Sequence, residues 1–167
     1  SSDLHLVDSP QVIVVNAKSP WKTLNDFLAE VRANPGKHSI GSLGPATTQH
    51  VAVAMFLKTA KIDLNYVPFT GGAPATNAIL GGHVTSIIGN YSEVVPQIEA
   101  GELRVLATTN GKRIAPLPDV PTVRELGLDF EVVAWFALVA TGKSPAPVRS
   151  EEHTSELQSR FGISYAV

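Results

Sequence analysis

The sequence predicts an α/β fold in which helices cover both faces of a parallel, doubly wound sheet. Apolar runs of strand character alternate along the chain with segments of helical periodicity. Breaks that contain glycine or proline separate them. Apolar residues make up 44% of the 167-residue chain and charged residues 17%, which is a globular balance. Strand and helix in strict alternation favour right-handed crossovers between parallel strands.

The first elements alternate between strand and helix. "QVIVVN" at 11–16 is a β-branched run and predicts a buried strand. Ser19-Pro20 predicts the start of a helix, which "NPG" at 34–36 ends. "HSIGSLG" at 38–44 predicts a strand that runs into a glycine loop, and "TTQHVAVAMFLKTAK" at 47–61 predicts a helix with a threonine cap.

The middle of the chain continues the same alternation. Four segments follow in the order strand, helix, strand, helix: 62–69, 73–80, 84–90 and 92–101. Gly81-Gly82 is typical of a helix C-terminus, so we expect it to end the first of these helices. Ser92 is the expected cap of the second.

The last predicted elements surround a proline-rich connection. "LRVLATT" at 103–109 predicts a strand. We expect a helix of one or two turns after Pro121, within "RIAPLPDVPTVRELG". "FEVVAWFALVA" at 130–140 predicts a further strand that is long for its class.

The two ends of the chain differ in character from the rest. "SSDLHLVDSP" has neither an initiator methionine nor the pattern of a signal peptide, so we interpret it as a cut end. "RSEEHTSELQSRFGISYAV" at 149–167 resembles the translation of a common sequencing-library adapter. We therefore expect residues 149–167 to be a non-native tail; a genuine polar C-terminal helix is the alternative.

Composition excludes several classes of function. The chain has no cysteine, which excludes disulfides, thiol chemistry and thiolate metal sites. A net charge of −2 without a basic stripe argues against a nucleic-acid surface. No stretch reaches the ~20 apolar residues that span a bilayer. Neither glycine loop is a Walker loop or a complete G-x-G-x-x-G, so we expect no bound cofactor, and we expect no metal.

Small and polar residues gather where the predicted strands end. The segments are "GSLGPATT", "FTGGAPA", "GNYS" and "TTNG", and three of them lead directly into a helix. Ligands of such sheets bind beyond the carboxyl ends of the strands. Helix N-termini offer unpaired N–H groups, and glycine lets an anion approach them. Phosphate and carboxylate both suit this pattern, but the loops contain no lysine, which favours a small carboxylate held by backbone N–H groups and hydroxyls.

Structural roles remain open for several of these residues. Gly71-Gly72 could form a plain turn, Asn90 could cap the following helix, and His50 could be structural. Ser42 with His50 suggests a hydrolase, but no G-x-S-x-G elbow surrounds the serine. We therefore expect no catalytic residue.

Four segments in combination resemble the Bug-type solute receptors of tripartite tricarboxylate transporters: "VPFTGGAPATNAILGGHV", "AGELRVLATTNGKRIAPLPDVPTVRELGL", "WFALVA" and "SPAPV". The resemblance runs from about residue 10 to residue 148. It implies a type II periplasmic binding-protein fold, with two α/β lobes joined by two crossing strands. It also implies a periplasmic receptor that captures a small organic carboxylate and delivers it to a membrane permease.

The resemblance also implies which residues bind the ligand. By position they are Ser42, Gly44, Thr47, Thr48, His50, Gly71, Gly72, Ala73 and Asn90. The chain departs from the family pattern at Phe69, where tyrosine is usual, at Thr70, where lysine or arginine is usual, and at Thr85, where an acidic residue is common. These departures leave the charge and identity of the ligand open.

The resemblance further implies the domain organisation. Residues 1–15 are a remnant of lobe one with the first crossing strand, 16–134 are lobe two, and 135–148 are the second crossing strand. The missing first lobe would be a partner of this chain, and one lobe alone would bind weakly. Two alternatives to a binding module remain: a small α/β enzyme for an anionic substrate, and a sensor lobe of the same fold.

Overall fold

The described part of the chain divides into two compact units. The computed structural model describes the backbone of residues 4–138 and the side chains of residues 9–134. Residues 10–134 form one unit, which contains a five-stranded sheet and four helices. In the other, strand β1 (Leu4–Ser9) pairs with β7 (Ala134–Leu138) as a two-stranded sheet. The predicted tail at 149–167 lies outside the described residues.

The five-stranded sheet is mixed but mostly parallel. Its strands are β2 (Gln11–Asn16), β3 (Ser39–Leu43), β4 (Asn65–Phe69), β5 (Ser86–Asn90) and β6 (Leu103–Thr108). They lie in the order β4-β3-β5-β2-β6. β3 pairs with β4 and β5 in parallel, as predicted. β2 differs, because it is antiparallel to both of its neighbours, β5 and β6.

The direction of β2 sets it apart from the rest of the sheet. Helix α1 follows β2 and leads to β3, which is not a neighbour of β2 in the sheet. Because β2 is antiparallel to β5 and β6, it begins at the edge where the other four strands end.

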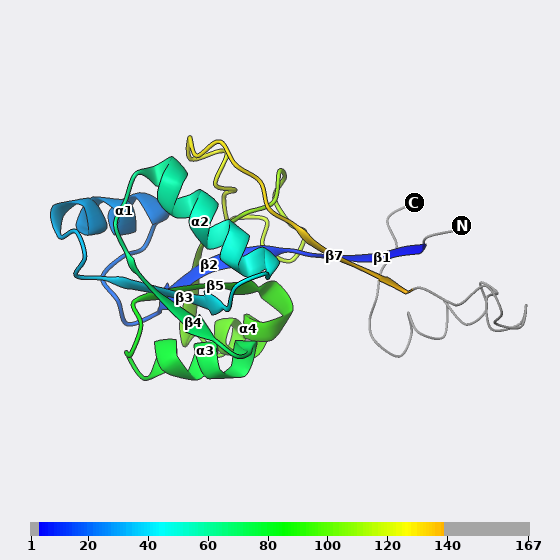
Figure 1. Ribbon diagram of the computed structural model, residues 1–167, viewed down its shortest axis with the longest axis horizontal. Coiled ribbons are helices and arrows are strands. Elements are labelled where there is room, and N and C mark those ends of the chain that lie inside the picture. The colour runs from blue at the N-terminus through cyan, green and yellow to red at the C-terminus, as the bar shows by residue number, and fades with distance from the viewer. Residues whose placement is uncertain (1–3, 139–167) are drawn as a thin grey trace, which may run out of the picture. The chain divides into compact units, whose positions relative to one another are not determined.

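Helices cover both faces of the sheet (Figure 1). α1 (Leu24–Ala33) and α2 (Thr48–Ala60) lie on one face, and α3 (Gly72–Leu80) and α4 (Tyr91–Glu99) on the other. Alternate residues of β2 serve the two layers: Ile13 and Val15 are buried with α1 and α2, whereas Val12 and Val14 are buried with α3. β2 is therefore apolar on both faces, which is why its sequence is a continuous β-branched run.

Two helix starts differ from the prediction. α1 does not begin at Ser19-Pro20, because the Ser19 N–H donates to the Asn16 carbonyl in a turn. It begins after Thr23, where Thr23 and Asp26 form a reciprocal capping box. α4 begins at Tyr91 with Asn90 as its N-cap, so Ser92 is not the cap.

Two predictions near the end of the unit are also wrong. No helix forms after Pro121; the chain makes turns closed by bonds such as Gly127 N–H to the Arg124 carbonyl. β7 begins at Ala134, not at residue 130, because Val132 exchanges hydrogen bonds with Thr109 at the end of β6 instead. Residues 139–140 lie outside the described residues.

Other local predictions are confirmed. Thr47 caps α2, and Asn34 ends α1. Gly81 is the C-cap of α3, and Gly82 follows with a positive φ of 74°, which glycine adopts without strain. Among residues 4–138, every helix falls short of the length and apolarity that a bilayer-spanning segment needs.

Candidate functional site

The residues predicted to bind a ligand all lie along one edge of the sheet. β3, β4, β5 and β6 end at this edge. The segments that follow β3, β4 and β5 lead into α2, α3 and α4. The Gly44 N–H donates to the Phe69 carbonyl at 3.1 Å, which joins the loop after β3 to the end of β4. Asn90, the last residue of β5, lies opposite Gln11 across the antiparallel β2–β5 pair.

The N-terminus of α2 is satisfied by its own cap. The Thr47 hydroxyl accepts from the His50 N–H at 3.2 Å and lies 2.9 Å from the Gly44 carbonyl oxygen, to which it can donate. Thr48 bonds the adjacent Gln49 side chain. Ser42 is fully buried and donates to the Leu43 carbonyl at 3.0 Å. The hydroxyls of this loop are therefore used mainly to hold its own backbone.

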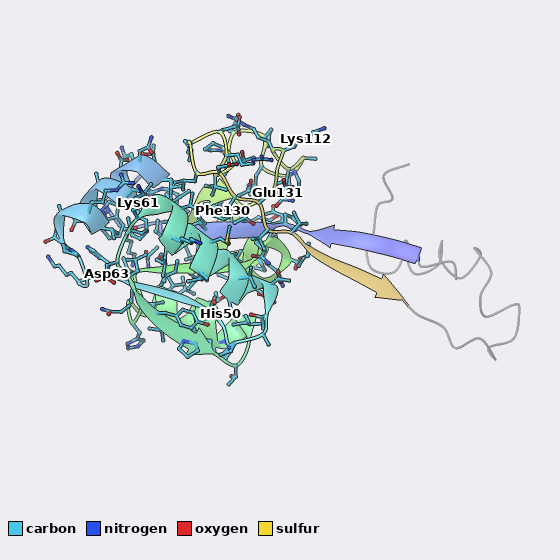
Figure 2. The ribbon with its side chains drawn as sticks, turned by 45° about the horizontal axis from the view of Figure 1, so that its top comes forward. His50, Lys61, Asp63, Lys112, Phe130 and Glu131 are labelled. Carbon is cyan, nitrogen blue, oxygen red and sulfur yellow. The ribbon has the colours of Figure 1, made fainter. Side chains whose placement is uncertain are left out.

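His50 packs against an aromatic ring beside this loop. It lies at the N-terminal end of α2, and Lys61 lies at the other end (Figure 2). Its ring centroid is 5.1 Å from that of Tyr66, and the Tyr66 hydroxyl donates to the Leu43 carbonyl at 2.8 Å. Ser42 makes its hydrogen bonds to Leu43 and Tyr66. The geometry therefore does not pair Ser42 with His50 as a nucleophile and base.

The N-terminus of α3 has no such cap. Its N-cap is Gly71, in extended conformation at φ −175°, and no described side chain caps the helix by a hydrogen bond. A Cβ built on Gly72 would lie 2.7 Å from both Cδ and Oε2 of Glu93. The Glu93 carboxylate, from the first turn of α4, thus lies directly against the Gly72 α-carbon. The Asn90 amide donates to Glu93 Oε1 at 3.2 Å and helps to hold it there.

A hollow of about 310 Å³ lies between α3 and α4 at this position. Six residues line the α3–α4 hollow: Gly72, Ala73, Thr76, Asn77, Glu93 and Gln97. Thr76 is only 4% exposed, and within the described part of the chain neither its Oγ1 nor the buried Oε1 of Gln97 has a hydrogen-bond partner. A buried polar atom without a partner is costly, so both atoms point to a guest or a water.

Sequence reasoning identified only Gly72 and Ala73 among these six. Thr76 and Asn77 lie one helical turn after them, and Gln97 lies one turn after Glu93. That spacing of four residues places each pair on one helix face. The signal was present, but choosing this face required knowledge that α3 and α4 are neighbours.

A second pair of buried polar side chains was predicted only in part, because Asn90 was among the expected ligand contacts and Gln11 was not. Gln11 is fully buried, and neither polar atom of its amide has a hydrogen-bond partner among residues 9–134. Asn90, opposite Gln11, is 8% exposed and has an unpartnered Oδ1. A prediction that read 11–16 only as a buried strand left no polar role for Gln11.

Charge is distributed unevenly around the site. Between Lys61 and Arg104 the chain contains no lysine or arginine. Two carboxyl groups of the described residues have displaced pKa values and lie away from the site: hydrogen bonds from Thr23 lower the pKa of Asp26, and a hydrogen bond from Arg113 lowers that of Glu125. Within the described residues, no cluster of three or more His, Asp or Glu could hold a metal ion.

Comparison with known sequences finds related transport proteins. The family model described as "Tripartite tricarboxylate transporter family receptor" matches residues 3–159. A UPF0065 protein of Cupriavidus necator is 38% identical over 128 residues, which are 77% of this chain and 39% of that protein. Protein BugT of Bordetella pertussis is 33% identical over 134 residues, 80% of this chain and 41% of BugT. The chain thus spans about two fifths of the length of these curated relatives.

Comparison with solved structures finds the same kind of protein as the comparison of sequences. A TctC solute binding protein from Polaromonas superposes with a TM-score of 0.79 at 29% identity, over 97% of this chain and 59% of that one. Rpa4515 of R. palustris, solved with adipate, superposes with a TM-score of 0.82 at 27% identity, over 93% of this chain and 52% of Rpa4515. MatC of Rhodopseudomonas palustris, with bound malate, superposes with a TM-score of 0.77 at 25% identity, over 95% of this chain and 54% of MatC. The type II periplasmic binding-protein architecture predicted for this unit is confirmed.

Proposed function

The chain belongs to the tripartite tricarboxylate transporter receptor family, and from that premise we propose that it is the ligand-binding part of a periplasmic solute receptor. The receptor captures a small organic carboxylate and presents it to a membrane permease. Its role is binding, without catalysis.

One observation carries the proposal: the N-termini of α2, α3 and α4 lie along one edge of the sheet, and that of α3 has no cap. Helix N-termini carry a partial positive charge and free N–H donors, which suit a carboxylate. The adipate and malate held by two structural relatives are small dicarboxylates and support the same ligand class.

The candidate residues fall into two sets, according to whether they have hydrogen-bonding groups available to a ligand. Gly71, Gly72 and Ala73 offer backbone N–H groups at an uncapped helix, and we propose these as direct contacts. Asn90 keeps a free Oδ1 close by. Ser42, Gly44, Thr47, Thr48 and His50 form the neighbouring loop, and we propose that they shape the other side of the site.

Membership of this receptor family also suggests a domain organisation for the chain. We propose that residues 16–134 form the second lobe of the receptor and that 135–148 return toward the first. The compact unit at residues 10–134 supports the first part of this assignment. The first lobe would complete the site, because closure of two lobes around a ligand excludes water.

A titration of the isotope-labelled chain followed by amide NMR tests the proposal. Succinate, malate, adipate and aspartate are added separately, with sodium chloride as the control for ionic strength. We expect at least one carboxylate to shift the amide signals of residues 71–73 and 90 in a saturable way, with weak affinity. If no member of the panel shifts them beyond the chloride control, the proposal is wrong.

A further inference from the structure

The N-terminus of α3 already faces a negative charge from the chain itself. The carboxylate of Glu93 lies against Gly72, in the position where the partial positive charge of the helix is strongest. It therefore offsets part of the attraction that a ligand carboxylate would feel there. A second carboxylate in the α3–α4 hollow would meet electrostatic repulsion from Glu93.

No cationic side chain of the neighbouring elements compensates for Glu93. The chain from β4 through α4 contains neither lysine nor arginine, and within the described side chains Glu93 forms no ion pair. Its one described hydrogen bond comes from the neutral amide of Asn90. Glu93 is exposed, so its carboxylate is within reach of a solute.

The α4 side of the hollow adds a second acceptor to the Glu93 carboxylate. Within the described residues Gln97 Oε1 has no hydrogen-bond partner, and it can only accept. The buried Thr76 hydroxyl, on α3, is also without a described partner and can both donate and accept. The N–H donors lie on the side of Gly72 and Ala73. One wall of the hollow therefore suits a carboxylate, and the other suits a group that carries N–H donors and positive charge.

We propose that the α3–α4 hollow recognises a zwitterion, a small carboxylic acid that also carries an ammonium group, and that Glu93 is the counter-ion of that ammonium. This rests on the proposed function and narrows its ligand class to amino acids over plain dicarboxylates. A hollow of about 310 Å³ is within the range of small-molecule sites. In this arrangement Glu93 determines specificity, because it attracts one part of the ligand and repels acids that lack that part.

Aspartate and succinate form a matched pair of probes, since aspartate is succinate with one hydrogen replaced by an ammonium group. Each is titrated into the isotope-labelled full chain, and the amide signals of Gly72, Ala73, Thr76 and Gln97 are followed. We expect aspartate to bind about two- to fivefold more tightly, the factor that one solvent-accessible ion pair provides.

Two variants assign this preference to Glu93. Glu93→Gln keeps an oxygen for Asn90 but removes the charge, so the preference for aspartate should fall to near unity while succinate binds at least as well as before. Glu99→Gln removes the same charge from the exposed end of α4, outside the residues that line the hollow. It should leave the preference unchanged.

Each result has a distinct meaning. If Glu93→Gln strengthens both ligands equally, Glu93 only blocks the helix terminus, and the counter-ion role is overturned. If wild-type chain binds succinate as tightly as aspartate, the inference fails while the proposed function stands. If neither ligand nor any other carboxylate shifts these signals, both fail together.

Discussion

The N-termini of α2 and α3 follow neighbouring parallel strands through similar glycine-containing loops, but their first amides meet different groups. At α2, the Thr47 hydroxyl accepts from the His50 N–H, and an aromatic pair lies beside the loop. At α3, Gly71 contributes no side chain, and the carboxylate of Glu93 from another helix lies against the α-carbon of Gly72. A side-chain cap supplies an acceptor for one of the N–H groups that the helix itself leaves free. Where no side chain caps the helix, the acceptor has to come from elsewhere in the fold, from water or from a ligand.

The comparison also separates two kinds of glycine. Gly41, within β3, lets the Phe69 ring pack against the sheet; a Cβ there would lie 2.7 Å from Phe69 Cε2 and 3.2 Å from Ile87 Cγ2. Gly72 makes room only for the exposed side chain of Glu93. Gly41 is therefore needed for packing within the sheet, whereas Gly72 leaves space for a side chain of the candidate site.

The largest expected effect comes from Gly41→Ala. The added methyl group meets a ring and a buried isoleucine, and such overpacking costs about 1–3 kcal/mol of unfolding free energy. Gly72→Ala should cost much less, because Glu93 can swing away into solvent. Urea denaturation of both variants measures the difference. Equal losses would show that the two glycines do not play different roles.

Thr47→Ala should have the next largest effect. It removes the cap of α2 and should lower the free energy of unfolding by about 1 kcal/mol. Thr47→Ser, which keeps the hydroxyl, is the matched control and should retain most of the stability. Gly71→Ala at α3 removes no cap, so it should cost less than Thr47→Ala in the same denaturation experiment. A loss at Gly71 as large as that at Thr47 would contradict the comparison.

Gly71→Ser should give the α3 terminus a side-chain cap, but a weaker one than that of α2. The position is extended and its Cβ would meet only Pro74 Cδ at 3.7 Å, so a serine fits. Pro74, at the third helical position, has no N–H, so the new hydroxyl can accept only from the Ala73 N–H, and the gain in stability should be at most about a few tenths of a kcal/mol. The hydroxyl should also weaken carboxylate binding, because it competes for that N–H. A stabilised variant that binds as tightly as the original would show that the Ala73 amide does not contact the ligand.

The smallest effect concerns α1, whose capping box depends on pH. Hydrogen bonds from Thr23 lower the Asp26 pKa in the folded state below its ordinary value of 3.8. The ionised form therefore stabilises the fold above that pH, and this contribution is lost as the pH falls through the lower folded-state value. Asp26→Asn should be slightly less stable than the original near pH 6, and the two should converge in strong acid. Glu99→Gln, which breaks no cap, should not show this convergence; a constant difference for Asp26→Asn would contradict the linkage.

Much of the fold was predictable because its signals are local. The Thr47 cap, the Gly81-Gly82 end of α3 and the strand at 11–16 each depend on residues close in sequence. Where two local signals competed, the prediction chose the wrong one: Ser19-Pro20 resembled a helix start, but Thr23 with Asp26 formed the reciprocal box. The edge that carries the candidate site was also predictable, because parallel strands end together.

The sequence by itself determined the order of strands and helices between residues 11 and 108, the apolar character of β2 on both faces and the loops at the candidate site, since these follow from periodicity and capping chemistry. It missed strand β1 and predicted a helix after Pro121 that does not form. Only the tertiary structure decided that β2 runs antiparallel between β5 and β6. It also decided that Glu93 lies against Gly72 and that Gln11 is opposite Asn90. These features depend on hydrogen bonds and contacts between segments distant in the chain, and no local pattern of residues specifies which segments become neighbours.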